Sequence, residues 1–174
     1  IYNVMCAICY GLIYKVKLSK IKQAILSYNP EHFRIEAIAK VNSINFFNDS
    51  KSTNIASTLA STETIKGSII LLLGGSKKGL DYTQLFEKLT KRVKQICVFS
   101  EISNDLILAN NGKFKMEDCK TLSNAFDFAI SVSKPNDTIL LSPASASYDQ
   151  FKNYIERGNA FNKKVKEYEK AISK

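Results

Sequence analysis

Residues 68–79 read Ser-Ile-Ile-Leu-Leu-Leu-Gly-Gly-Ser-Lys-Lys-Gly, a short apolar run followed at once by a glycine-rich polar turn. An apolar run of this length without alternation is typical of a strand that is buried on both faces, as in a parallel sheet. The glycines permit a tight turn, and the lysines after them can meet a carboxylate or a phosphate. The stretch therefore predicts a buried strand over 68–73 with a ligand-binding loop after it.

Comparable strand and helix patterns lie on both sides of this stretch. We expect further strands at 35–41, 44–47, 95–99, 113–116 and 138–141, and helices at 53–64, 82–91, 103–109, 122–133 and 148–171. Repeated strand–helix units with short connections predict right-handed crossovers and an α/β fold: a Rossmann-like three-layer domain with a mostly parallel sheet. Residues 1–14 and 19–27 read as two helical pieces that Pro30 ends, and these form a short helical appendage.

Length and composition favour one globular domain plus this appendage, since 174 residues with 45% hydrophobic content can bury a core. No apolar run approaches the roughly 18 residues that cross a bilayer, and no basic region precedes the uncharged opening. We therefore expect a cytoplasmic protein without a signal peptide. The chain opens on Ile1 in what reads as the middle of a helix, so we also expect a longer protein with residues upstream.

The net charge of +9 raises the possibility of an anionic partner. The lysines are scattered along helices and chain ends, which favours a solvated surface, and no groove-reading helix or stacking aromatic strand is evident. A basic module that binds a polyanion stays open as an alternative. Cys6 and Cys9 have zinc-like spacing, but they lie in an apolar helical stretch and the lone His32 is distant, so we expect no metal site.

Two further polar segments follow strands and open helices: residues 48–54, Asn-Asp-Ser-Lys-Ser-Thr-Asn, and residues 142–151, Ser-Pro-Ala-Ser-Ala-Ser-Tyr-Asp-Gln-Phe. A helix N-terminus offers N–H groups to an anion, and a fixed carboxylate such as Asp49 can accept ribose hydroxyls. An ordinary helix cap explains residues 48–54 equally well. The glycine loop is not a Walker A loop, because Gly79-Leu80 follows Lys78 where that motif has Ser or Thr. It also lacks the Gly-x-Gly-x-x-Gly pattern of dinucleotide enzymes, so a nicotinamide enzyme is disfavoured.

The motifs at 48–54 and 71–75, with the run from Leu140 to Tyr154 and Glu-Arg-Gly at 156–158, resemble the UDP-N-acetylmuramoyl-L-alanine:D-glutamate ligases (MurD). The likeness covers essentially the whole chain in the expected order. It implies that residues 1–33 are the C-terminal helical end of a central ATP-binding domain with its hinge, and that residues 34–174 are the C-terminal Rossmann-like glutamate ligase domain.

The resemblance also implies roles for single residues. Four residues match positions that contact ATP. Asn3 matches an asparagine that contacts adenine, and Arg34 matches an arginine of a hinge segment. Asp49 matches the residue that holds the ribose hydroxyls, and Lys51 lies where the family has a residue near the phosphates. Thr53, Lys78, Ser147, Tyr148 and Tyr154 match residues around D-glutamate, Tyr148 through its backbone N–H. Phe33 is inserted in the hinge pattern, and Tyr148 and Tyr154 stand where the family often has Leu and Phe.

The implied reaction is ATP-dependent amide formation: the carboxylate of UDP-N-acetylmuramoyl-L-alanine becomes an acyl phosphate, which the amine of D-glutamate attacks. We expect the Mg²⁺ ligands to lie mainly in the missing part of the central domain. This fragment alone should be inactive, because the phosphate loop is missing. No nucleic acid or membrane partner is expected, and the protein should be a monomer. The rival readings are another muramyl ligase with different amino-acid specificity and the basic polyanion-binding module.

Overall fold

The structure is a computed structural model that describes residues 2–29 and 31–173. The chain divides into two compact units, Ile1–Glu31 and His32–Lys174, and each is considered by itself. Among the described residues, none of the helices combines the length and the apolar content that crossing a bilayer requires.

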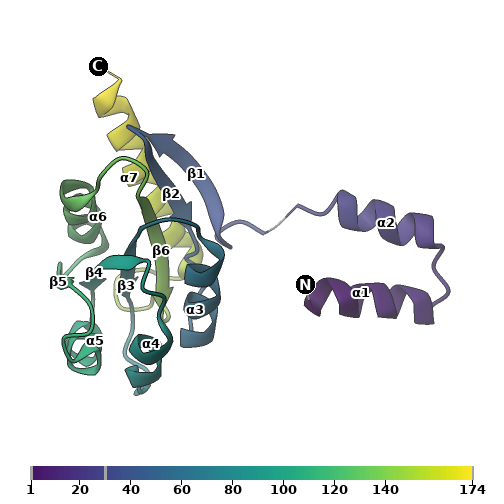
Figure 1. The fold of residues 1–174 in the computed structure, drawn as a ribbon, viewed down its shortest axis with the longest axis horizontal. Helices are drawn as coiled ribbons and strands as arrows, with labels where there is room; N and C mark the ends of the chain where they lie inside the picture. The colour runs from purple at the N-terminus through teal and green to yellow at the C-terminus, as the bar shows by residue number, and fades with distance from the viewer. Residues whose placement is uncertain (1, 30, 174) are drawn as a thin grey trace. The chain divides into compact units, whose positions relative to one another are not determined.

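The larger unit contains a six-stranded sheet in the order β1-β2-β6-β3-β4-β5. Its strands are β1 (Glu36–Val41), β2 (Ile44–Asn48), β3 (Ile69–Gly74), β4 (Val93–Phe99), β5 (Met116–Asp118) and β6 (Thr138–Ala144). All neighbouring pairs are parallel except β1–β2, a hairpin whose turn residues Asn42 and Ser43 both have positive φ, 48° and 61°. The predicted mostly parallel α/β sheet is thus confirmed (Figure 1).

Helices cover both faces of this sheet: α3 (Ile55–Thr64), α4 (Thr83–Lys88), α5 (Ser103–Asn110), α6 (Leu122–Val132) and α7 (Tyr154–Ile172). Alternate residues of β3 enter two cores. Ile70 and Leu72 pack with residues of α6 and α7, while Ile69, Leu71 and Leu73 pack with residues of α4 and α5. A strand whose six residues are all buried needs apolar side chains at every position, which is why the run is continuous.

Two predicted elements have different bounds in the structure. The last helix begins at Tyr154 instead of residue 148, because Asn153 caps it by accepting a hydrogen bond from the Glu156 N–H at 2.9 Å. The fifth strand is Met116–Asp118 instead of 113–116. The side chain of Asn110 binds both the N–H and the carbonyl of Phe114, each at 2.9 Å, and so holds that residue in a loop.

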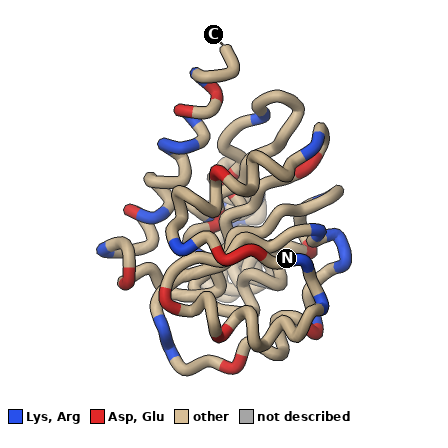
Figure 2. Tube along the Cα trace, turned by 90° about the vertical axis from the view of Figure 1, so that its left-hand side faces the viewer, with Lys and Arg blue, Asp and Glu red and all other residues tan. Residues whose placement is uncertain are grey.

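Charged residues are spread over the chain, with lysines and arginines interspersed among acidic residues in the view of Figure 2. Several lysines have acidic partners, among them Lys94 with Asp137 and Lys164 with Asp127. The excess of positive charge is therefore distributed and is not gathered into one block.

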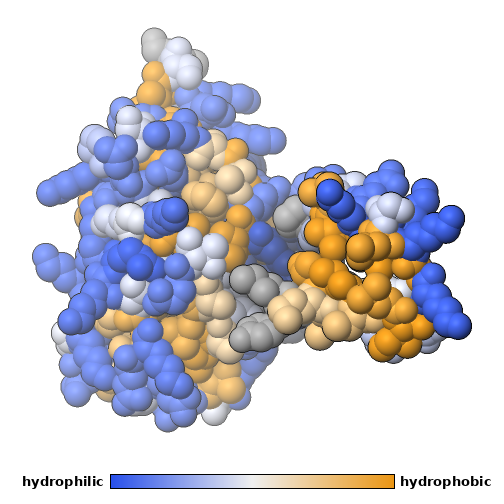
Figure 3. Space-filling model, turned by 45° about the vertical axis from the view of Figure 1, so that its right-hand side comes forward, coloured by the Kyte–Doolittle hydropathy of each residue, from blue (hydrophilic) through white to orange (hydrophobic). Residues whose placement is uncertain are grey.

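The smaller unit consists of α1 (Tyr2–Ile13) and α2 (Leu18–Leu26). Ile21 is its one buried large hydrophobic residue among those described, whereas Met5, Ile13 and Leu26 are 53%, 73% and 76% exposed. Figure 3 shows hydrophobic residues, in orange, over much of this unit. Two short helices cannot bury their own apolar side chains, so this surface is of the kind that another part of a protein covers.

Candidate functional site

The polar segments that follow β2, β3 and β6 lie side by side at the carboxyl edge of the parallel strands. Main-chain hydrogen bonds of 2.8 to 3.0 Å join them: the Asp49 N–H to the Leu141 carbonyl, the Ala144 N–H to the Ser52 carbonyl, and the Ser76 N–H to the Ala146 carbonyl. This edge is where α/β sheets bind ligands.

Asp49 is turned into the domain and is only 2% exposed. Its Oδ2 accepts hydrogen bonds from the hydroxyls of Ser61 at 2.5 Å and Ser142 at 2.7 Å, and its Oδ1 accepts one from the Ile35 N–H at 3.2 Å. The carboxylate thereby ties α3 and β6 to the start of β1. These three bonds leave one acceptor position on Oδ1, but the carboxylate is buried, so the ribose contact stays a prediction.

Asn48 and Ser50 attach the same segment to α7. The Asn48 amide donates to the Gly158 carbonyl at 2.9 Å and to Asn162 Oδ1 at 2.7 Å, and its oxygen accepts from the Ser50 N–H at 3.0 Å. The Ser50 hydroxyl donates to the Tyr154 carbonyl at 2.8 Å. Asn48 and Ser50 therefore hold the start of the motif against α7.

The second half of the segment is closer to the surface. Lys51 and Thr53 are half-buried, and Lys51 Nζ lies 5.6 Å from the centroid of the Tyr154 ring. Asn54 caps α3 by accepting from the Ser57 N–H at 2.9 Å. The capping interpretation is thus confirmed for Asn54, whereas ligand binding by Lys51 and Thr53, which precede α3 in the chain, stays a prediction.

Close approach of the segments after β3 and β6 depends on Gly75. Its φ is +146°, and a Cβ placed there would lie 1.9 Å from the Ala146 carbonyl oxygen and 3.1 Å from an Arg157 nitrogen. The Ser145 hydroxyl donates to the Ser76 carbonyl at 2.7 Å, which adds a second connection. The glycine that the sequence places in a tight turn therefore also brings the two loops into contact.

The loop after Gly75 carries Lys77 and Lys78, both exposed. Lys77 Nζ lies 3.6 Å from the Asp105 carboxylate, so the side chain is directed toward α5. The main-chain N–H of Lys77 donates to the Glu101 carboxylate at 3.1 Å. Lys78 makes no ion pair among the residues that the structure describes. Of the two lysines, Lys78 is the one whose ammonium group remains for a ligand.

The residues predicted after β6 differ in exposure. Ser147 is 2% exposed, and its carbonyl accepts from the Phe151 N–H at 2.8 Å, whereas Tyr148 is 74% exposed. Tyr154, at the start of α7, packs edge-on against Phe33 with ring centroids 6.3 Å apart. The inserted Phe33 is therefore a buried anchor for the segment before β1.

Arg34 and Asn3 are the remaining predicted nucleotide contacts. Arg34 is exposed just after Phe33, and Asn3 is exposed on α1 in the smaller unit. The structure places Asn3 in a different unit from all the other predicted site residues.

Our sequence reasoning missed Arg157 as a site residue, although the Glu-Arg-Gly run contains it. It is fully buried, and its guanidinium donates to groups in all three segments: Ser50 Oγ and the carbonyls of Ser50, Gly74, Ser145 and Ala146. A signal was present, because Arg157, Phe161 and Val165 are four residues apart and so share the apolar face of α7.

The chain matches known proteins along most of its length. The family described as Mur ligase, glutamate ligase domain, matches residues 33–145. A UDP-N-acetylmuramoylalanine–D-glutamate ligase of Solibacter usitatus is 35% identical over 165 residues, which are 95% of this chain and 37% of that protein. The ligase of the same name from Chlamydia caviae is 35% identical over 157 residues, 90% of this chain and 38% of that protein.

Solved structures show the same fold at low identity. A folylpolyglutamate synthase of Mycobacterium tuberculosis, complexed with ADP and AMPPCP, superimposes with a TM-score of 0.63 and 14% identity over 87% of this chain and 37% of that one. A MurF ligase of Thermotoga maritima in complex with ADP gives 0.53 and 14% over 82% of this chain and 33% of that one. The chain spans 37% and 38% of the length of the two curated relatives. By its match over residues 33–145, the chain belongs to the Mur ligase family and carries its glutamate ligase domain.

Proposed function

We propose that this chain is the glutamate-binding part of an ATP-dependent ligase that joins D-glutamate to UDP-N-acetylmuramoyl-L-alanine through an acyl-phosphate intermediate, a step of peptidoglycan precursor synthesis. The observation that carries this proposal is the meeting of segments 48–54, 74–79 and 142–151 at one edge of the sheet, in a chain whose curated relatives bear the name of that ligase. A role in cell-wall formation, and through it in cell shape and division, follows from the proposal.

The proposed D-glutamate binding site, called the glutamate seat below, is formed by Thr53, Lys78, Ser147, Tyr148 and Tyr154. The Lys78 ammonium suits a substrate carboxylate, because a charge-assisted hydrogen bond is stronger than a neutral one. The Thr53 hydroxyl, the Ser147 hydroxyl and the Tyr148 N–H would orient the rest of the amino acid. Fixing both carboxylates aims the amine at the acyl carbon, and positioning of this kind contributes on the order of several kcal/mol to catalysis.

The proposed nucleotide contacts are Asn3, Arg34, Asp49 and Lys51. Lys51 stands beside the N-terminus of α3, a combination that favours phosphate oxygens. Asp49 would serve the ribose through Oδ1, which accepts only the Ile35 N–H, at 3.2 Å. ATP bound there supplies the phosphoryl group of the acyl phosphate.

Magnesium would be held mainly outside this chain. Among residues 2–29 and 31–173, no group of three or more His, Cys, Asp and Glu is placed to hold a metal ion. The cationic side chains near the site instead suit the phosphates and carboxylates of the substrates.

We further propose that residues 1–33 are the end of the central ATP-binding domain with its hinge, and that residues 34–174 close over the substrates. The exposed apolar side chains of α1 and α2 fit this assignment, because the remainder of such a domain would cover them. The chain alone should then fold yet form no amide. We expect the complete enzyme to be a cytoplasmic monomer.

The first experiment follows phosphate release by the complete protein that carries this chain, with ATP and UDP-N-acetylmuramoyl-L-alanine. D-glutamate, L-lysine, meso-diaminopimelate and L-alanine are compared as acceptors. Release with D-glutamate alone supports the proposal, whereas release with another amino acid moves the protein to a different muramyl ligase. Release with none, together with salt-sensitive DNA binding, would favour the polyanion-binding module.

A matched pair of lysine variants then tests the seat of glutamate. Lys78→Ala should raise KM for D-glutamate at least tenfold, about 1.4 kcal/mol, because the substrate carboxylate loses its cationic partner. Lys77→Ala removes an equally exposed lysine of the same loop that is already paired with Asp105, so it should leave KM nearly unchanged. Equal effects of the two variants would argue against the assigned role of Lys78.

A further inference from the structure

Arg157 is a cation held inside the larger unit without a carboxylate partner. It is 0% exposed, and no ion pair joins it to an acidic residue among those the structure describes. Burial lowers its pKa to about 10, and the nearby Asp149 partly opposes this shift. The guanidinium therefore remains charged at neutral pH even though it has left water.

The guanidinium donates its hydrogen bonds to neutral oxygens of the three site segments. Nε donates to the Ser50 hydroxyl at 3.1 Å and one terminal nitrogen to the Ser50 carbonyl at 2.9 Å. The other terminal nitrogen faces the carbonyls of Gly74 at 3.4 Å, Ser145 at 3.0 Å and Ala146 at 3.2 Å. A planar group with five N–H donors can bind several fixed acceptors at once, which a lysine ammonium cannot reproduce.

Stability alone is a weak reason for such a group. Removing a charge from water costs several kcal/mol, and well-packed apolar residues often stabilise a core as well or better. The geometry that this cation imposes is the more specific consequence. Ala146 directly precedes Ser147 of the proposed glutamate seat, Gly74 begins the loop that carries Lys78, and Ser50 lies three residues before Thr53. Ser50 also holds the Tyr154 carbonyl, so one side chain connects the seat to α7.

We propose that Arg157 is a positioning residue that holds the segments after β2, β3 and β6 in the arrangement that receives the amino-acid substrate. It touches no substrate itself and acts through Ser50 and the carbonyls of Gly74, Ser145 and Ala146. The inference rests on the proposed function, since it assigns to these segments the seat of D-glutamate.

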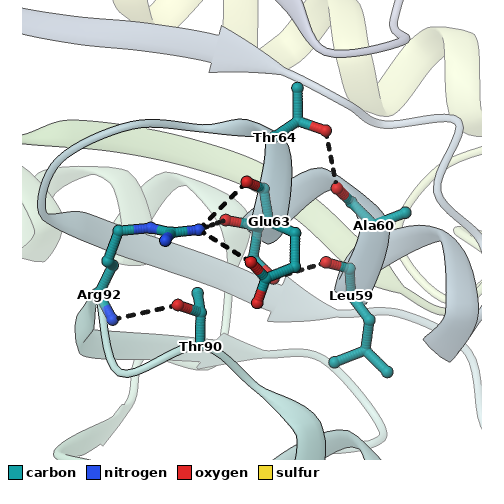
Figure 4. A network of polar contacts seen from close by, with 7 residues as sticks. Leu59, Ala60, Glu63, Thr64, Thr90 and Arg92 are labelled. Carbon is teal, nitrogen blue, oxygen red and sulfur yellow. Dashed lines mark hydrogen bonds and ion pairs between the residues drawn. The ribbon is translucent and has the colours of Figure 1, made fainter.

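The control for this inference is Arg92, which also binds main-chain carbonyls but lies at the opposite, amino end of the sheet. One terminal nitrogen of Arg92 donates to the carbonyls of Thr62 and Glu63, each at 3.1 Å, and contacts the Glu63 carboxylate at 3.2 Å (Figure 4). Arg92→Lys therefore disturbs an arginine network of similar kind without touching the site segments.

The test measures the kinetics of Arg157→Lys, Arg92→Lys and Ser50→Ala in the complete protein, well below each variant's melting temperature. Arg157→Lys should raise KM for D-glutamate at least tenfold and leave KM for UDP-N-acetylmuramoyl-L-alanine within about twofold. A change in KM distinguishes positioning from a loss of folded protein, because the latter lowers kcat alone. Ser50→Ala should give a smaller rise of the same kind, and Arg92→Lys none.

The possible outcomes separate this inference from the proposed function. If the unaltered protein uses D-glutamate but Arg157→Lys changes only kcat or melting temperature, Arg157 is a structural residue and the inference is overturned. If Arg157→Lys does not fold, an unchanged KM for D-glutamate in Ser50→Ala overturns it, and a raised one supports it. If the unaltered protein does not use D-glutamate, the proposed function itself fails.

Discussion

Gly75→Ala should be far more damaging than Gly79→Ala, although both glycines lie in one loop and both have positive φ. The φ of Gly75 is +146° and that of Gly79 is +62°. A methyl group at residue 75 would lie 1.9 Å from the Ala146 carbonyl oxygen, whereas one at residue 79 would meet nothing within 4 Å. Both variants introduce backbone strain, and only the one at residue 75 adds a steric contact.

The expected magnitudes follow from the contacts that must break. At residue 79 only the conformational strain of a left-handed alanine arises, about 1 kcal/mol. At residue 75 the loops must also separate, which sacrifices the hydrogen bond from the Ser76 N–H to the Ala146 carbonyl, about 1 kcal/mol, and weakens a charge-assisted bond from Arg157, about 1.5–3 kcal/mol. The total for Gly75→Ala is about 3–5 kcal/mol.

Urea denaturation of the chain, followed by far-UV circular dichroism, measures both variants, because the sequence contains no tryptophan to report by fluorescence. The unfolding free energies should differ by at least about 2 kcal/mol between the two variants, on the hydrogen-bond values used above. Equal losses would refute the reasoning, since they would mean that the loops move apart without cost and that the close approach at Gly75 does not hold the site together.

Asp49→Ala should cost about 2–4 kcal/mol in the same assay, because two hydroxyls and an N–H lose a buried acceptor; a loss below 1 kcal/mol would contradict this. Asn54→Ala should cost about 1 kcal/mol through the lost cap of α3, and an unchanged unfolding midpoint would argue against the cap. Burial raises the pKa of Asp137, but hydrogen bonds from Lys94 and the Lys134 N–H outweigh it and hold the pKa below its ordinary value of 3.8. Its stabilising contribution is therefore present above that value and is lost as pH falls through the folded-state pKa, so Asp137→Asn should flatten the loss of stability in acid. Parallel acid-unfolding curves of variant and parent would contradict this.

The sheet could be predicted because its strands are short and buried on both faces. Every residue of β3 and β6 is buried, so each appears in the sequence as an unbroken run of apolar or small side chains. The start of α7 could not be predicted in this way. Phe151 lies at helical spacing from Ile155, but residues 147–151 form a turn in which the Ser147 carbonyl accepts from the Phe151 N–H. The helix begins only after its cap, Asn153. Apolar spacing alone does not distinguish a turn of that kind from a helix.

The candidate site was predictable only for residues whose chemistry is local. Asn54 caps the helix that it precedes, and the Gly75 turn follows directly from its strand. The contacts of Asp49 and Arg157 join residues 11 to 107 positions apart, and nothing in either neighbourhood identifies their partners. Polar residues within residues 48–54 thus divide into buried ones that hold the segments together and half-buried ones near the surface. A motif specifies which groups are present, but the division between the two classes is set by α7, which packs its arginine beneath all three loops.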